Sequence, residues 1–133
     1  MFKKLSRINE PEKSLYNNIL LLSRNKLFYT KFNLADTFQN RIYLIFIHIS
    51  FLFIKVKQSI KSNDYKFFYQ KVFDLIFAKI EANMREIGHG DVYVNKNMKL
   101  LVKNFYNILL YCENFKEKSI KSKNHFWLKY LTL

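Results

Sequence analysis

Apolar residues recur along the chain with the three- and four-residue spacing of amphipathic helices, and this rhythm defines the elements that we expect. The first helix runs from about Glu12 to Leu27, directly after Pro11, because proline suits the start of a helix. Its apolar face consists of Leu15, Ile19 and Leu22. An aromatic link, residues 28–33, leads to the second helix.

The second predicted helix contains the most apolar run of the chain, residues 42–54. Asp36 or Thr37 can cap its start, and it continues to about Ile60. The apolar run has 13 residues, about 20 Å as a helix, whereas the hydrocarbon core of a membrane is about 30 Å thick. A helix that is apolar nearly all round is typical of the buried centre of a bundle, and we expect that place for it.

The third helix is expected from about Asp64 to Ile87, and the polar run at 61–64, KSND, breaks the pattern before it and supplies its cap. Gly88 then suits the left-handed conformation that ends a helix. Two aromatic residues, Phe67 and Phe77, lie off the apolar side of this helix and are expected at the surface. That apolar side consists of Tyr65, Phe68, Tyr69, Val72, Ile76, Ile80 and Ile87.

The fourth helix follows a turn that Gly90 and Asp91 complete, and it runs from about Asn95 to Phe115. Its apolar stripe keeps the helical rhythm closely, through Met98, Leu101, Val102, Phe105, Leu109 and Cys112. A polar run, residues 116–124, then leads to a last apolar piece, residues 125–133, which we expect to form a short docked helix.

The composition supports an all-α fold, a single compact bundle of about four main helices with a short C-terminal helix. The chain has only two glycines and one proline, whereas sandwiches, barrels and glycine-rich nucleotide-binding folds need frequent turn residues. A length of 133 residues, half of them hydrophobic, fits one domain with a sizeable core. We expect this domain over residues 1–133, with its core at about 12–115 and a flexible segment at 1–11.

The charge is strongly positive, with 23 lysine and arginine residues against 10 acidic residues, a formal net charge of +13. Such an excess favours an anionic partner: nucleic acid, acidic protein or anionic lipid. Part of it is what A/T-rich codons produce, since Lys, Asn, Ile, Phe and Tyr are all frequent. No base-reading motif accompanies the charge, so we expect no specific DNA binding.

The chain offers no catalytic or metal-binding motif. Cys112 is the only cysteine, which excludes a disulfide framework. Its place on the apolar stripe of the fourth helix predicts that it is a small buried hydrophobic residue. His48, His89 and His125 are far apart and have no metal-type companion at helical spacing. His48 lies within the apolar helix and is expected to be a core histidine with a hydrogen-bond partner. We therefore expect neither an enzyme nor a cofactor.

One helix face stands out as a candidate surface. Lys96, Lys99 and Lys103 share the face of the fourth helix opposite its apolar stripe, and Leu110 and Tyr111 fall on or beside it. Apolar and aromatic residues beside lysines are typical of a protein-binding surface, since they contribute contact area while charge steers the partner. The alternative is a merely solvated face.

The joint between the third and fourth helices is similar to a known family. The stretch Asn83–Asp91, NMREIGHGD, with Val94, Asn95, Lys96 and Lys99 after it, resembles the signature of the ubiquinol–cytochrome c chaperone family. Three further stretches agree: LYNNI at 15–19 with FY at 28–29, DTFQNR at 36–41 with Leu44 and His48, and FY at 105–106. Together they span residues 15–115 in order.

The chain departs from the family pattern at two places. Asn40 stands where the family usually has glycine, so the start of the second helix is expected to differ. Asn107 and Ile108 replace a frequent glycine–arginine pair, so any role of that arginine is absent.

The resemblance implies a non-catalytic, all-helical assembly factor without a cofactor. Such proteins bind newly made cytochrome b and help to build the ubiquinol–cytochrome c oxidoreductase, and mitochondrial members work with a small partner protein near the ribosome. The long extension of mitochondrial members is missing, and no apolar signal core follows the first residues. We therefore expect a bacterial member of the family, located in the cytoplasm or bound peripherally at the cytoplasmic face of the inner membrane. We do not expect it to span the membrane. A location in the mitochondrial matrix is expected only if the source is eukaryotic.

The alternative function is a basic helical protein that binds RNA or the ribosome. For the joint itself, two interpretations remain open. In one, Gly88 and Asp91 cap the two helices while Arg85 and Glu86 make local ion pairs. In the other, the joint and the lysine face together contact the client. The candidate partner-binding residues are Arg85, Glu86, Asp91, Lys96, Lys99, Lys103 and Tyr111, and the candidate structural residues are Asp36, Arg41, His48, Gly88 and Gly90.

Overall fold

In the computed structural model, which describes residues 10–132, the chain is an all-α bundle, as predicted, and no strand occurs among these residues. The helices are α1 (Glu10–Ser23), α2 (Leu27–Thr30), α3 (Phe38–Ser59), α4 (Ser62–Ile87), α5 (Asp91–Glu113) and α6 (Ile120–Tyr130), with a 3-10 turn, η2 (Phe115–Glu117), before α6. Residues 1–9 of the segment expected to be flexible lie outside the described residues, and residues 10 and 11 belong to α1.

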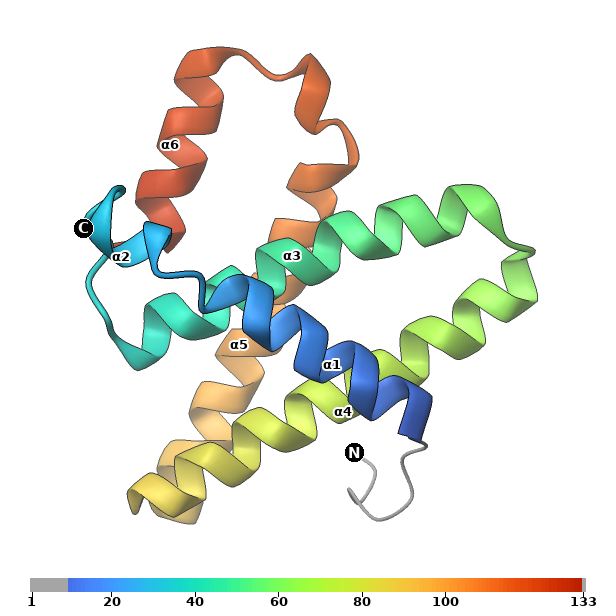
Figure 1. Ribbon diagram of the computed structural model, residues 1–133. Coiled ribbons are helices and arrows are strands. Elements are labelled where there is room, and N and C mark those ends of the chain that lie inside the picture. The colour runs from blue at the N-terminus through green and yellow to red at the C-terminus, as the bar shows by residue number, and fades with distance from the viewer. Residues whose placement is uncertain (1–9, 133) are drawn as a thin grey trace.

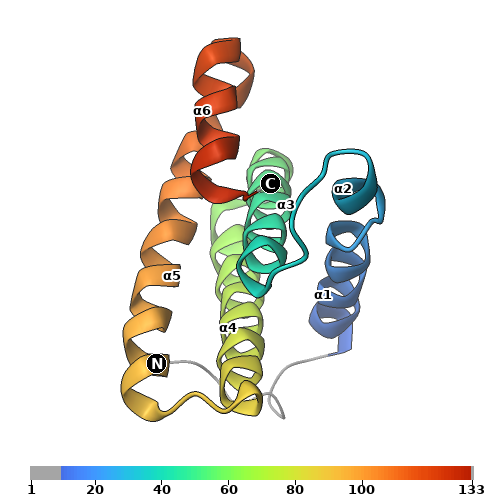
Figure 2. The same ribbon diagram turned by 90° about the vertical axis from the view of Figure 1, so that its left-hand side faces the viewer.

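The helices are arranged in three layers around α3 (Figure 1). Figure 2 shows α5 on one side, the α3–α4 hairpin in the middle, and α1 with α2 on the other side. α3 packs against α1, α4 and α5, and α1 also contacts α4. After α5 the chain turns back through η2 and α6, so that its end lies beside α2 and the start of α3 (Figure 1).

The apolar run of α3 is the buried centre of the bundle, as predicted. Every residue from Ile42 to Ile47 is buried, and Phe46, Ile49 and Phe53 are fully inaccessible. By length and apolar composition α3 could cross a membrane, with 22 residues and a mean hydropathy of 1.4 over its most apolar window. Half of that window is buried inside the protein, so contacts with three other helices account for its apolar character.

An aromatic cluster joins α3, α4 and α5 at the centre of the core. The ring of Phe105 on α5 lies 5.2 Å from Phe46 of α3 and 5.8 Å from Phe77 of α4, centre to centre. Phe53 and Phe73 complete the cluster, at 6.1 Å and 5.9 Å from Phe105. Most of these rings meet edge to face, a geometry worth roughly 0.5–1.5 kcal/mol per pair beyond the burial of area.

The expectation that Phe77 is exposed is wrong, because the buried surface of α4 extends around more of the helix than the predicted apolar side. Residues 72–77 are all buried, since α4 is covered by α1 on one side and by α3 and α5 on the other. Phe67 lies nearer the start of α4 and is 63% exposed, as expected.

Two residues assigned to apolar faces point outward. Leu22 is exposed because the buried face of α1 consists of Tyr16, Ile19 and Ser23 instead. Ile87 is exposed because it is the last residue of α4, next to the turn.

The starts of α3, α4 and α5 differ in how they are capped. Thr37, rather than Asp36, caps α3, since its hydroxyl oxygen accepts a 3.1 Å hydrogen bond from the backbone N–H of Asn40. α4 begins at Ser62 after Lys61 as its N-cap, so Asp64 lies in its first turn, and no side chain of the run 61–64 forms a capping hydrogen bond. α5 begins at Asp91, four residues before the predicted start, with Gly90 as its N-cap.

Asp36 has a different partner. Its carboxylate accepts a 2.8 Å hydrogen bond from the Arg41 guanidinium, one turn into α3. This hydrogen bond lowers the pKa of Asp36, so the pair is charged at neutral pH. Asp36 and Arg41 thus form an ion pair at the start of α3.

Asn40 ties the end of the chain to the start of α3. Its side chain is fully buried, and its Nδ2 donates to the carbonyl oxygens of Ala35 and Thr132, both at 2.7 Å. Its Oδ1 accepts from the backbone N–H of Thr132 at 2.8 Å. The residue that departs from the family pattern therefore fixes a contact between segments 92 positions apart.

Cys112 and His48 have the environments that the sequence predicts. Cys112 is buried in α5, and burial raises the pKa of its thiol to about 12, which makes it unreactive at neutral pH. His48 is half-buried, and its Nδ1 lies 2.7 Å from the carbonyl oxygen of Leu44 one turn earlier. Its ring meets Phe28 edge to face at 5.9 Å.

Candidate functional site

The corner between α4 and α5 has the geometry of a glycine-terminated helix (Figure 1). Gly88 adopts φ 107° and ψ 11°, the left-handed conformation predicted for it. Its N–H donates to the carbonyl of Arg85 at 3.0 Å, and the N–H of His89 donates to that of Met84 at 3.2 Å. Gly90 has an ordinary extended conformation, φ −80°, so its role does not depend on the freedom of glycine.

Arg85 bridges the two helices at this corner. Its guanidinium donates to the carboxylate of Asp91 and lies 3.6 Å from Glu81, one turn earlier on α4. The hydrogen bond with Asp91 raises the pKa of Arg85. Asp91 is therefore an ion-pair partner in the first turn of α5 and not a cap, contrary to one of the interpretations. Glu86 is exposed and pairs with no cation among residues 10–132.

Replacing Gly88 with valine is expected to lower the free energy of unfolding by about 2 kcal/mol, because a β-branched residue is strained at this φ. No atom lies within 4 Å of an added Cβ, so the effect would come from backbone conformation alone. Gly88→Asn should be milder, since asparagine tolerates this conformation. Gly90→Ser is the matched control and should be neutral, because serine is a good N-cap at a normal φ. Urea unfolding of the three variants measures these effects, and a Gly88→Val protein as stable as Gly90→Ser would contradict them.

The α5 outer face continues from this corner. At about 100° per residue, its members fall within an arc of roughly 80°, opposite the buried stripe. All of them are exposed, and Val92 and Leu110 are the most accessible of the apolar ones, at 84% and 63%. We define the α5 outer face as Val92, Lys96, Lys99, Lys103, Tyr106 and Leu110.

Tyr111 does not belong to this face. Its ring is half-buried and stacks on Phe126 of α6, with centres 4.3 Å apart and planes at 4°. Its hydroxyl lies 2.8 Å from the hydroxyl of Ser122, also on α6. The expectation that Tyr111 is exposed beside the lysines is wrong, because α6 folds back over it.

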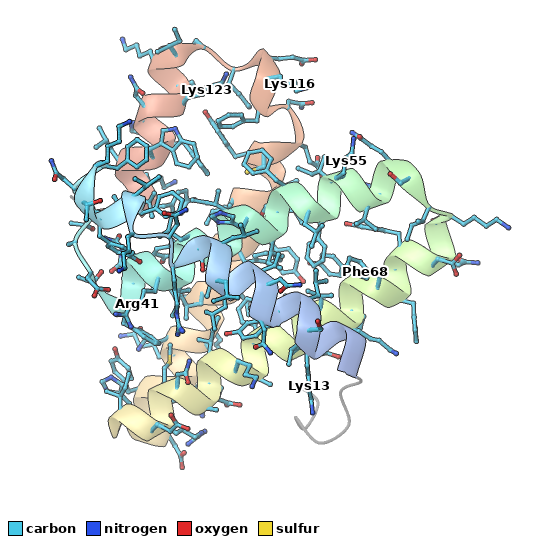
Figure 3. All side chains as sticks on the ribbon, in the orientation of Figure 1. Lys13, Arg41, Lys55, Phe68, Lys116 and Lys123 are labelled. Atoms are coloured by element: carbon cyan, nitrogen blue, oxygen red, sulfur yellow. The ribbon has the colours of Figure 1, made fainter. Side chains whose placement is uncertain are left out.

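The candidate residues therefore form two groups. Arg85, Glu86 and Asp91 lie at the corner that the α5 outer face extends, whereas Asp36, Arg41 and His48 lie on or before α3. Figure 3 labels Arg41 near the start of α3. Within residues 10–132 no three His, Cys, Asp or Glu side chains form a group that could hold a metal ion. The corner and the α5 outer face offer a surface for binding.

Sequence reasoning missed an apolar pocket between α2, α3 and α6. The cavity measures about 570 Å³, within the range of about 300–1,000 Å³ typical of small-molecule sites. The sequence does contain the two apolar segments that form it, residues 28–33 and 125–133. The hydrophobic pattern does not predict that these two segments lie side by side in the fold. The lining residues are Phe28, Phe32, Leu34, Leu44, Ile47, His48, Phe51, Trp127, Leu128 and Leu131.

Comparison with known proteins gives one family. No curated protein sequence and no solved structure matches the chain. The family model described as ubiquinol–cytochrome C chaperone matches residues 30–120, more than half of the 133 residues. The match includes α3, α4 and α5, and with them the corner and the α5 outer face. The chain therefore belongs to the ubiquinol–cytochrome C chaperone family.

Proposed function

We propose that this protein is a non-catalytic assembly chaperone that binds newly made cytochrome b and supports assembly of the ubiquinol–cytochrome c oxidoreductase. Membership of the ubiquinol–cytochrome C chaperone family supports a client-binding role. We further propose that it acts on the cytoplasmic side of the membrane. The observation that carries the proposal is the α5 outer face, where three exposed lysines lie between exposed apolar side chains inside the family match.

The chemistry of this face suits a client that is itself a membrane protein. Val92, Tyr106 and Leu110 can bury apolar area against a client segment that has not yet reached the bilayer. Residues 92–112 contain no acidic side chain, so the lysines produce a positive field along the whole face. Charge speeds and orients the encounter, while the apolar contacts hold the complex.

We expect the combined substitutions Lys96→Glu, Lys99→Glu and Lys103→Glu to impair the accumulation of cytochrome b while leaving the fold intact. Each lysine is exposed, so the melting temperature should stay near that of the natural protein. Three changes of two charge units each move the local charge by six units, enough to reverse the steering of an anionic partner. The measurements are thermal melting and the level of assembled complex in the host that encodes the protein.

The matched control carries the same substitutions at Lys57, Lys61 and Lys66, which are exposed around the α3–α4 turn. This control should assemble the complex normally. Normal assembly by the α5 variant, or equal impairment in both variants, would show that this face is only solvated.

Salt dependence tests the identity of the client. A tagged copy should retain cytochrome b when salt rises from about 50 to 200 mM, because buried apolar area contributes to the complex. RNA binding would weaken steeply over the same range through counterion release. Recovery of RNA without cytochrome b at low salt would contradict the proposal.

A further inference from the structure

The pocket between α2, α3 and α6 lies on the side of α3 opposite the aromatic cluster of the core. Leu44, Ile47, His48 and Phe51 follow one another at helical spacing, opposite the stripe of Phe46, Ile49 and Phe53. These two stripes, each about two turns long, explain why this part of α3 is apolar on both sides.

The pocket has a buried floor and an exposed apolar rim. Leu44, Leu34 and Leu131 form the floor and are buried. At the rim, Phe32 is 57% exposed and Leu128 is 67% exposed. A pocket for a soluble small molecule normally encloses its ligand. Exposed apolar residues around the opening instead favour contact between the rim and another apolar surface.

The elements around the pocket carry positive charge only. α2, α3 and α6 contain no acidic residue. Two exposed lysines are neighbours of the rim residues in sequence. Lys31 directly precedes Phe32, and Lys129 directly follows Leu128 in α6. Asp36, in the loop before α3, is already paired with Arg41.

Two further lysines lie one helical turn from residues that line the pocket, and both are labelled in Figure 3. Lys55 follows Phe51 by one turn of α3. The Nζ of Lys123 lies 4.8 Å from the centre of the Phe115 ring, which in turn contacts Phe51 at 5.3 Å. An apolar pocket with lysines near it is complementary to a ligand that has an apolar chain and an anionic head group.

We propose that this pocket takes one acyl chain of an anionic phospholipid and so docks the α2–α6 end of the protein on an anionic membrane surface. A bilayer supplies the apolar chain and the phosphate groups together, and stable anchoring requires both kinds of contact. A transmembrane helix of a client would need an extended groove rather than a cavity of about 570 Å³. The lining residues come from α2, α3, α6 and the segments beside them and not from α5, so this site is separate from the α5 outer face.

Trp127 makes the proposal directly testable, because it is the only tryptophan and it lines the pocket. The full chain is mixed with phosphatidylcholine vesicles that contain phosphatidylglycerol with brominated acyl chains. We expect bromine to quench the emission of Trp127 and the protein to float with the vesicles. Vesicles of brominated phosphatidylcholine alone should neither quench nor bind, since they lack the anionic head group.

Substitutions at the rim separate the pocket from the general positive charge. Leu128→Glu should weaken vesicle binding at least about tenfold without unfolding the protein, because Leu128 is exposed. Leu110→Glu on α5 is the matched control and should bind normally. Lys31→Glu with Lys129→Glu should also weaken binding about tenfold, whereas Lys57→Glu with Lys61→Glu should not.

Three results would overturn the proposal. Flotation without quenching of Trp127 would mean that charge alone binds the vesicles. Quenching by a free brominated fatty acid but not by the vesicles would mean a site for a soluble ligand. Loss of cytochrome b capture by Leu128→Glu, with vesicle binding unchanged, would assign the pocket to the client.

Discussion

Replacing Phe105 with alanine is expected to lower the free energy of unfolding by about 3–5 kcal/mol, a large share of the roughly 5–15 kcal/mol typical of a domain. Phe105 is 1% exposed and its ring contacts rings from α3 and α4. Alanine would remove these contacts and leave a cavity where three helices meet, which the rigid surroundings cannot fill. Urea unfolding followed by circular dichroism measures the loss.

Leu110→Ala is the control for this prediction, because it removes an apolar side chain from the same helix at a position 63% exposed. Its effect should stay below about 1 kcal/mol. If the two variants were equally stable, Phe105 would not lie at the junction of α3, α4 and α5. The comparison therefore tests the helix arrangement and not only the hydrophobicity of the side chain.

Local signals explain which parts of the fold the sequence predicts well. The Thr37 cap, the apolar run of α3 and the left-handed Gly88 all depend on residues within a few positions of one another. The start of α5 is missed because Gly90 caps it through the backbone, and the residues that follow carry no apolar stripe until Val94. Helical periodicity detects a buried face, and it does not detect an exposed first turn.

Contacts between distant segments explain the rest. Phe77 is buried because α4 has neighbours on two sides, and the width of a buried arc is not encoded in the periodicity of one helix. The α5 outer face was predictable, since lysines at helical spacing opposite an apolar stripe must be exposed. Tyr111 was not, because its burial depends on where α6 docks.

The docking of α6 is expected to depend on Asn40. Replacing Asn40 with alanine should lower the free energy of unfolding by about 2–3 kcal/mol, since it removes three hydrogen bonds from a fully buried site. The N–H of Thr132 would lose its partner, whereas the carbonyl oxygens of Ala35 and Thr132 would keep one backbone donor each, the N–H of Thr37 and the N–H of Ala35. Thermal melting and urea unfolding measure the effect, and Gln39→Ala, an exposed neighbour, is the control and should be neutral.

The same substitution should also open the pocket, and this gives it a second readout. Thr132 directly follows Leu131, which forms part of the pocket floor, and Trp127 lies one turn earlier in α6. Once Thr132 is held by the N–H of Ala35 alone, Trp127 should become more exposed to water, and its emission should shift to longer wavelength in the folded protein. Asn40→Gly, which restores the residue usual in the family, should behave like Asn40→Ala. If Asn40→Gly melts like the natural protein with unchanged emission, the aromatic contacts of α6 and the 3.0 Å hydrogen bond from the N–H of Ala35 to the carbonyl of Thr132 are enough to hold α6, and the Asn40–Thr132 hydrogen bonds are not what positions the pocket.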